Sequence, residues 1–154
     1  MSVEQTTRSP TDTVLGMWRA LSARDWDAVQ TFLSDDCIYL DVPVGPVAAA
    51  KGPEDIVKRL KIGLAPLAGY QNFDGLLVAD GEHVMYEHSE QWDWASGESA
   101  TLRFVTVHRV VGEVITVWKD YWNMSALTDH APPTWLADFA TADMSWMYDA
   151  TGEV

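Results

Sequence analysis

The stretch that decides the fold runs from Tyr70 to Met124 and reads YQNFDGLLVADGEHVMYEHSEQWDWASGESATLRFVTVHRVVGEVITVWKDYWNM. Apolar and polar residues alternate through most of it, which is typical of half-buried strands. Short turns that contain glycine divide it into four predicted strands: Tyr70–Val78, His83–Trp94, Ala100–Val110 and Val114–Met124. Because connections this short join antiparallel neighbours, we expect one curved antiparallel sheet.

The residues before this stretch predict helices and one further strand. Ser9-Pro10-Thr11 and Pro53-Glu54-Asp55 are typical helix starts, with a proline in the first turn. A second, shorter helix is expected around Trp26 to Leu33, then a strand from Cys37 to Val42 and a loop from Pro43 to Gly52. This order predicts an α+β fold in which three to four helices pack on one face of the sheet.

Length and charge limit the classes of function. The chain has 154 residues, enough for one ordinary domain, and a formal net charge of −13. We therefore expect no nucleic-acid or membrane partner, because such a surface repels phosphate backbones and anionic lipids. The polar N-terminus and the lack of a long apolar run favour a cytoplasmic protein. We expect a disordered arm over residues 1–10, a domain over 11–124, and a C-terminal segment over 125–154 that packs on a pocket mouth or on a partner.

Strand parity indicates which side chains share a pocket. On the last strand, Asp120 lies between Trp118 and Trp122 on one face. A carboxyl flanked by indoles either serves chemistry or is a structural acid whose hydrogen bonds are satisfied. On the strand His83–Trp94 we assign the odd positions, including Gln91 and Asp93, to the pocket face.

Three short segments of the chain resemble limonene epoxide hydrolases. Trp118-Lys119-Asp120-Tyr121-Trp122 is similar to their Trp-Arg-Asp-Tyr-Phe, Glu90-Gln91-Trp92-Asp93 to their Glu-Arg-x-Asp, and Tyr39-Leu40-Asp41 to their Tyr-x-Asn. The order of elements is also similar from about Thr11 to Met124. The resemblance implies a cone with a deep pocket, as in the wider SnoaL-like, ketosteroid-isomerase-like group.

The resemblance also implies roles for individual residues. In that family one Asp, with a Tyr and an Asn, deprotonates a water, a second Asp protonates the epoxide oxygen, and an Arg bridges the two acids. Carried over, Asp120 is the base, Asp93 the proton donor and Tyr39 the residue that orients water. Gln91 stands at the Arg position and Asp41 at the Asn position. Three carboxyls in an apolar cone cannot all stay ionised at low cost, so we expect one of them to hold a proton.

Two other classes of function remain open. The first is an isomerase, a dehydratase or a carbon–carbon lyase, in which Asp120 or Asp41 removes a proton and Tyr39, Asp93 or His108 assists at oxygen. A hydrogen bond between His108 and Asp120 would favour this class. The second is a cone protein that binds a ligand without turning it over.

The sequence thus predicts an acid–base enzyme, with epoxide hydrolysis as the leading hypothesis. We expect a small hydrophobic substrate, cyclic or aryl-bearing, and neither a cofactor nor a metal. Beside the acids, the predicted lining comprises Trp18, Leu60, Leu64, Leu102, Phe104, His108, Trp118, Trp122 and Met124. The outer sheet face is expected to form a homodimer, the commonest oligomer, as the resembling family does.

Overall fold

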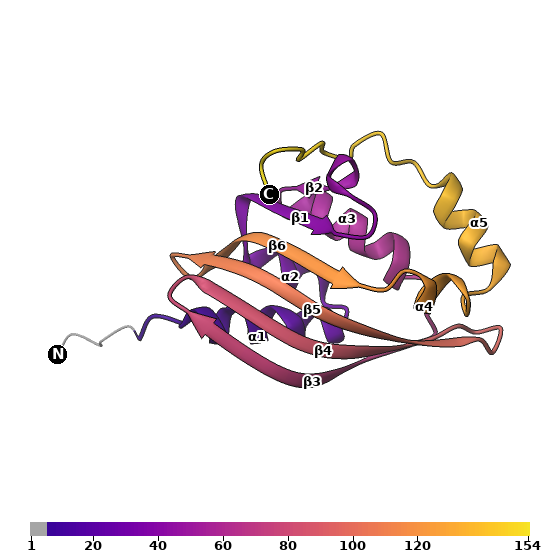
Figure 1. The fold of residues 1–154 in the computed structure, drawn as a ribbon, viewed down its shortest axis with the longest axis horizontal. Coiled ribbons are helices and arrows are strands. Elements are labelled where there is room, and N and C mark those ends of the chain that lie inside the picture. The colour runs from indigo at the N-terminus through magenta and orange to yellow at the C-terminus, as the bar shows by residue number, and fades with distance from the viewer. Residues whose placement is uncertain (1–5) are drawn as a thin grey trace.

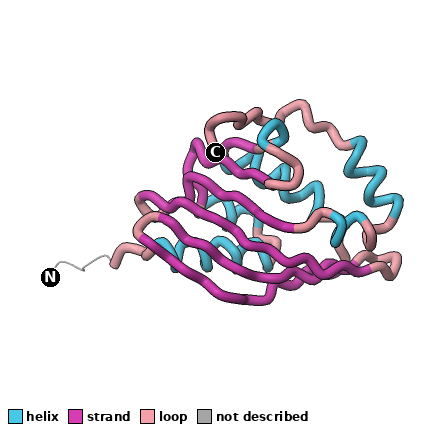
Figure 2. Tube along the Cα trace, viewed as in Figure 1, coloured by secondary structure: helices cyan, strands magenta, loops and turns pink. Residues whose placement is uncertain are grey.

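A single six-stranded sheet organises the molecule (Figures 1 and 2). The computed structural model describes residues 6–154. The strands are β1 (Leu33–Asp41), β2 (Ala50–Lys51), β3 (Gly69–Asp80), β4 (His83–Asp93), β5 (Ser99–Val111) and β6 (Val114–Trp122). They lie in the order β2-β1-β6-β5-β4-β3, and every neighbouring pair is antiparallel except β1 and β6, which are parallel. The predicted α+β fold with a curved, mainly antiparallel sheet is confirmed.

Helices α1 (Pro10–Ser22), α2 (Trp26–Thr31) and α3 (Pro53–Leu64) lie on one side of the sheet (Figure 1). The Ser9 hydroxyl accepts a hydrogen bond from the Asp12 amide and so caps α1, as the sequence suggests. The buried side of α1 includes Met17, Trp18 and Leu21, which belong to the main core together with the inner face of the sheet. One face of β4, β5 and β6 is therefore covered by helices and the other is open, while every residue of β3 stays at least partly exposed.

The predicted boundaries differ from the structure at several places. Strand β1 begins at Leu33, four residues before the expected Cys37, and its register against β6 is irregular between Leu33 and Ile38. The expected loop after β1 contains a short 3-10 helix, η1 (Pro46–Ala48), and the edge strand β2. Of the expected N-terminal arm, residues 1–5 lie outside the described residues, whereas the Arg8 amide donates to Glu113 and α1 begins at Pro10.

The segment after the sheet folds back across the molecule. It contains α4 (Ser125–Thr128) and α5 (Pro133–Thr141), both on the side of α3 (Figure 1). Its far end is fixed to the loop after β1, because Tyr148 and Ala49 form a β-bridge and the Ala150 amide donates to the Pro46 carbonyl. The C-terminal segment is therefore a strap held at both ends.

Candidate active site

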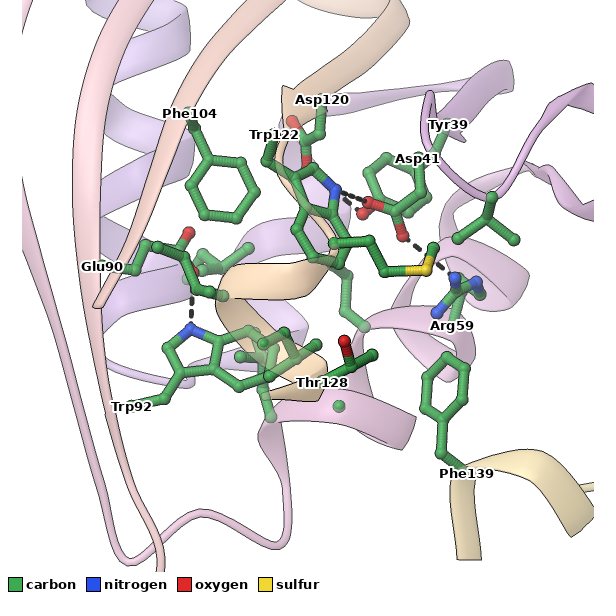
Figure 3. A pocket seen from close by; sticks show the side chains of 18 of the residues that line it. Tyr39, Asp41, Arg59, Glu90, Trp92, Phe104, Asp120, Trp122, Thr128 and Phe139 are labelled. Atoms are coloured by element: carbon green, nitrogen blue, oxygen red, sulfur yellow. Dashed lines mark hydrogen bonds and ion pairs between the residues drawn. The ribbon is translucent and has the colours of Figure 1, made fainter. Parts of the chain in front are cut away.

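A cavity of about 200 Å³ lies between the inner face of the sheet and the helices. Its wall is mostly aromatic and aliphatic, and three carboxyls and one guanidinium interrupt it: Asp41, Glu90, Asp120 and Arg59 (Figure 3). Predicted lining residues on the wall are Trp18, Leu60, Leu64, Leu102, Phe104, Trp118, Trp122 and Met124. The strap also contributes, through Leu127, Thr128, Trp135, Leu136 and Phe139.

The parallel pairing of β1 and β6 brings the first cluster together. Tyr39 pairs with Trp118, and Asp41 with Asp120, so two sequence segments about eighty residues apart meet side by side. Asp120 is only 4% exposed. One of its carboxyl oxygens accepts a hydrogen bond from the Tyr39 hydroxyl at 3.1 Å, and the other accepts one from the Trp118 indole at 2.6 Å. Both oxygens of Asp120 thus face donors.

Asp41 is paired with a cation that the sequence analysis did not identify. The Arg59 guanidinium of α3 lies 3.0 Å from one Asp41 oxygen, and the Trp122 indole donates to the other at 2.9 Å. Both members of the ion pair are nearly inaccessible, with side chains 6% and 10% exposed. The only sequence signal for Arg59 was a charge placed within the apolar stripe of a helix, between Ile56 and Leu60.

The prediction that Gln91 and Asp93 lie on the pocket face is wrong. Neither lines the cavity. Gln91 donates to Asp93 at 3.1 Å and accepts from Thr101 at 2.8 Å, on the face away from the helices. The reason is register: β4 pairs with β5 so that Glu90 lies opposite Leu102. Directly paired residues share a face, so the even positions of β4 accompany Leu102 into the interior.

Glu90 is the acid that β4 contributes to the cavity. It is 4% exposed, and one of its carboxyl oxygens accepts a hydrogen bond from the Trp92 indole at 2.7 Å. Burial raises the pKa of Glu90 from 4.5 to about 7, and the Asp41 charge acts in the same direction, whereas the Trp92 indole and the nearby Tyr70 hydroxyl lower it. Glu90 therefore changes charge near neutral pH.

His88 precedes Glu90 by two residues on the same face of β4. The segment Glu87-His88-Ser89-Glu90 has the spacing of the Glu-Arg-x-Asp motif, three residues before the segment that the sequence analysis chose. The His88 ring stacks between Tyr86 and Phe104, and its Nδ1 lies 2.7 Å from Asn72 Oδ1. Burial lowers the pKa of His88 to about 3, so this imidazole is neutral and brings no charge to the acids.

The structure places His108 in the core and not on the cavity wall, which corrects its predicted place in the lining. It is fully buried, and its Nε2 lies 3.3 Å from the Trp18 indole nitrogen, which donates to it. The partners of Asp120 are Tyr39 and Trp118, so the hydrogen bond between His108 and Asp120 that would favour an isomerase is not formed. Burial lowers the pKa of His108 to about 3.

The two remaining acids affect each other. Burial raises the pKa of Asp120 well above its usual range, and the charges of Asp41 and Glu90 raise it further, against the lowering effect of the Trp118 and Tyr39 donors. Desolvation and the same acids raise the pKa of the Tyr39 hydroxyl, which stays protonated. Since Asp41 is neutralised by Arg59, Asp120 and Glu90 form a pair that retains a proton near neutral pH.

Within residues 6–154 no three or more His, Cys, Asp or Glu side chains are grouped so that they could hold a metal ion. None of the helices in the same range combines the length and apolar character that crossing a membrane requires.

Comparison with known proteins assigns the chain to a family. Residues 14–118 match the model of the SnoaL-like domain. The chain belongs to the SnoaL-like domain family. The superfamily suggested by the sequence is thereby confirmed. No curated protein matched the chain.

Solved structures of three proteins illustrate the range of this fold. An epoxide hydrolase of M. tuberculosis that is similar to limonene epoxide hydrolases has 22% identity and a TM-score of 0.68, over 80% of this chain and 89% of that one. A protein from Shewanella putrefaciens that is assigned as a SnoaL-like polyketide cyclase has 15% identity and a TM-score of 0.69, over 78% and 83%. The Δ5-3-ketosteroid isomerase from Mycobacterium sp. has 18% identity and a TM-score of 0.66, over 77% and 96%. At these identities the likeness concerns the fold.

Proposed function

We propose that this protein is a cofactor-independent acid–base enzyme that acts on a small, hydrophobic, uncharged molecule, and that epoxide hydrolysis is its reaction. The observation that carries the proposal is the presence of two buried carboxyls, Asp120 and Glu90, on the wall of one apolar cavity. A cavity of 150 Å³ holds benzene, so about 200 Å³ accommodates a somewhat larger, monocyclic molecule. Cavities with few, convergent polar groups are typical of reaction sites.

The hydrogen bonds of the two acids suggest different roles. Both oxygens of Asp120 accept hydrogen bonds, which favours the ionised form at that position. Glu90 accepts one hydrogen bond, from Trp92, and no donor among residues 6–154 reaches its other oxygen, so this oxygen is the place for the shared proton. We therefore assign Asp120 as the general base and Glu90, in place of Asp93, as the general acid.

Epoxide opening by these two residues proceeds in one step. Asp120 takes a proton from a water molecule, whose oxygen attacks an epoxide carbon. The bond between that carbon and the ring oxygen breaks, and Glu90 gives its proton to the ring oxygen, so that epoxide and water become a diol. The proton on Asp120 then returns to Glu90 through solvent. Tyr39 positions the water beside Asp120, because its hydroxyl lies 3.1 Å from the carboxyl.

The test is turnover of cyclic and aryl epoxides in heavy-oxygen water. The proposal expects a diol that carries one labelled oxygen, formed by the wild type and by Asp93→Asn, whose carboxyl is outside the cavity. Asp120→Asn and Glu90→Gln are expected to lose this activity. Retained ligand binding with no turnover by the wild type would support a ligand-binding protein instead.

A second candidate is an isomerase, dehydratase or carbon–carbon lyase. It is favoured by the position of Arg59, which pairs with Asp41 rather than bridging Asp120 and Glu90 as the Arg of the epoxide hydrolase motif does. In this reaction Glu90 removes a proton from carbon, while the Tyr39 hydroxyl and protonated Asp120 donate to an oxyanion. Exchange of carbon-bound hydrogen into cyclic ketones in heavy water, followed by NMR, distinguishes this candidate from epoxide opening.

We also propose that the open face of the sheet forms a homodimer. Apolar side chains are exposed there along β3 to β6, with exposures from 40% to 68%: Phe73, Leu76, Val78, Met85, Val105 and Tyr121. Exposed apolar patches of this kind mark interaction sites. The same face carries Glu87, Arg103 and Lys119, and charges of both signs suit pairing with a second copy about a two-fold axis.

A further inference from the structure

The cavity wall has more negative than positive groups. Among residues 6–154, Arg59 is the only Lys or Arg on the wall, and its guanidinium is engaged with Asp41 at 3.0 Å. Neither Glu90 nor Asp120 has an ion pair with a Lys or Arg in the same range. When both acids are ionised, the cavity contains two negative charges that no Lys or Arg of the described part of the chain pairs with, and this is costly in an apolar surrounding.

Glu90 presents an acceptor without a partner to this cavity. Its Oε2 receives the Trp92 indole, but no donor within the described residues reaches its Oε1. The nearest basic nitrogen, Nδ1 of His88, is 4.0 Å away and is engaged with Asn72 at 2.7 Å. The Tyr70 hydroxyl is near enough to lower the pKa of Glu90 but lies beyond hydrogen-bond range of it. A ligand with a positive charge or an N–H group would supply what Oε1 lacks.

Indoles surround the acids in an arrangement that suits a cation. Trp92 donates its N–H to Glu90 and Trp122 donates to Asp41 (Figure 3). Trp118 donates in the same way to Asp120. All three rings border the cavity. Trp is the best partner for a cation above its ring, and hydrogen bonding of the N–H to an anion polarises the ring further.

From these contacts we infer that the cavity also binds small tertiary or quaternary alkylammonium ions, held by the carboxylate of Glu90 and by the surrounding indoles. A tertiary ammonium donates its single N–H to Oε1, and its alkyl groups contact the rings. A quaternary ion relies on charge and ring contacts alone. The inference goes beyond the proposed reaction, because the cation requires ionised Glu90 whereas epoxide opening requires its proton. Both ligands occupy one cavity, so the cation competes with substrate.

The test compares choline with 3,3-dimethyl-1-butanol, a neutral molecule of the same shape, by titration calorimetry on the full chain. Above the Glu90 pKa of about 7, for example near pH 8, choline is expected to bind about tenfold or more tightly than the alcohol. Glu90→Gln is expected to bring choline to the affinity of the alcohol. Asp93→Asn, the matched acid on the open face of the same strand, is expected to keep the preference.

The same comparison at lower pH needs no variant. Near pH 5.5, below the Glu90 pKa of about 7, the preference for choline is expected to fall to less than about threefold. The ionisable groups that face Glu90 are Asp41, Asp120, Arg59, Tyr70 and His88. Burial holds the pKa of His88 at about 3, so this imidazole is neutral at both pH values and does not contribute to the change.

Three results would overturn the inference: equal affinity for the two probes near pH 8, a preference for choline that persists in folded Glu90→Gln, or a preference that does not change with pH. Because the probes do not react, these results are independent of turnover. An enzyme without epoxide activity that still prefers choline would refute the proposed reaction and leave the cation site standing.

Discussion

The two faces of β4 each carry an acid, and the two acids differ in burial and in hydrogen bonding. On the inner face Glu90 is 4% exposed, with a raised pKa and one unpaired oxygen. On the outer face Asp93, three residues later, accepts a hydrogen bond from Gln91 and lies at the strand end. Both acids lie close to a tryptophan in sequence, since Trp92 follows Glu90 by two residues and directly precedes Asp93. Only the pairing with β5 places Glu90 on the cavity wall and Asp93 on the outer face.

The largest contrast is expected between Asp120→Asn and Asp93→Asn. The first removes the proposed base without changing the side-chain shape, so kcat is expected to fall by roughly 10²–10⁴-fold. The second is expected to change kcat by less than about twofold, because Asp93 does not reach the cavity. Steady-state kinetics on a cyclic epoxide measures both. Equal losses of kcat in the two variants would contradict the proposal that only the inner face of the sheet takes part in the reaction.

Arg59→Met tests the buried ion pair. It leaves Asp41 without its cation in a nearly inaccessible position, which is expected to cost about 3–5 kcal/mol of folding stability. Arg103→Met removes an exposed cation from the outer face and is expected to cost less than about 0.5 kcal/mol. Urea unfolding followed by circular dichroism gives both values. A small loss for Arg59→Met would show that Asp41 is neutralised in another way.

The pH dependence of turnover provides a third test. If Glu90 is the general acid, kcat/KM is expected to fall as the pH rises through about 7, because the proton is lost there. Asp93→Asn should keep this limb of the profile. A profile that stays flat from pH 6 to pH 9 would remove Glu90 from the proton-donating role, since its pKa of about 7 lies within that range.

The pH dependence of folding stability is a further test of the raised pKa of Glu90. The folded pKa of Glu90 is raised from 4.5 to about 7, so the folded state binds the proton more tightly than the unfolded state. Glu90 therefore lowers the free energy of unfolding as the pH rises from about 4.5 to about 7. Relative to wild type, Glu90→Gln is expected to gain melting temperature across this window. Calorimetric scans at several pH values measure the difference, which Asp93→Asn should not show.

Substitutions on the open face of the sheet are expected to have the smallest effect on activity. Val105→Glu introduces a charge where the proposed dimer buries an apolar row, so light scattering is expected to show monomers while kcat stays within about twofold. Val47→Glu, at an exposed position of η1 outside that face, is the control. A wild type that is monomeric at high concentration would refute the dimer and leave the cavity proposals intact.

The fold was predictable because alternation and short turns act locally. The positions of Asp120 and Tyr39 on the cavity wall were also predictable, because alternation along each strand puts them on the same face as buried aromatic residues. The β4 acids were misassigned because the resemblance of Glu90-Gln91-Trp92-Asp93 was given more weight than the alternation of Tyr86, His88, Glu90, Trp92 and Trp94. The pairing with β5 gives the correct faces: Glu90 lies opposite Leu102 and His88 opposite Phe104, and both β5 residues are predicted to face the interior.

Arg59 could not have been assigned to Asp41 from sequence. Its position on α3 is visible, but the contact depends on how α3 lies against β1, and pattern rules do not determine that distance. The strap is a similar case: apolar residues such as Trp135 and Phe139 indicated burial, whereas the bridge between Tyr148 and Ala49 that fixes its end depends on main-chain pairing.

The indole–carboxyl pairs have a practical consequence. Because Trp92 is one hydrogen bond from Glu90 and Trp118 one hydrogen bond from Asp120, each gain or loss of a proton at the site occurs beside a chromophore. The near-ultraviolet emission of the unlabelled protein should therefore follow the ionisation of the two acids directly, and it offers a spectroscopic titration before any substrate has been identified.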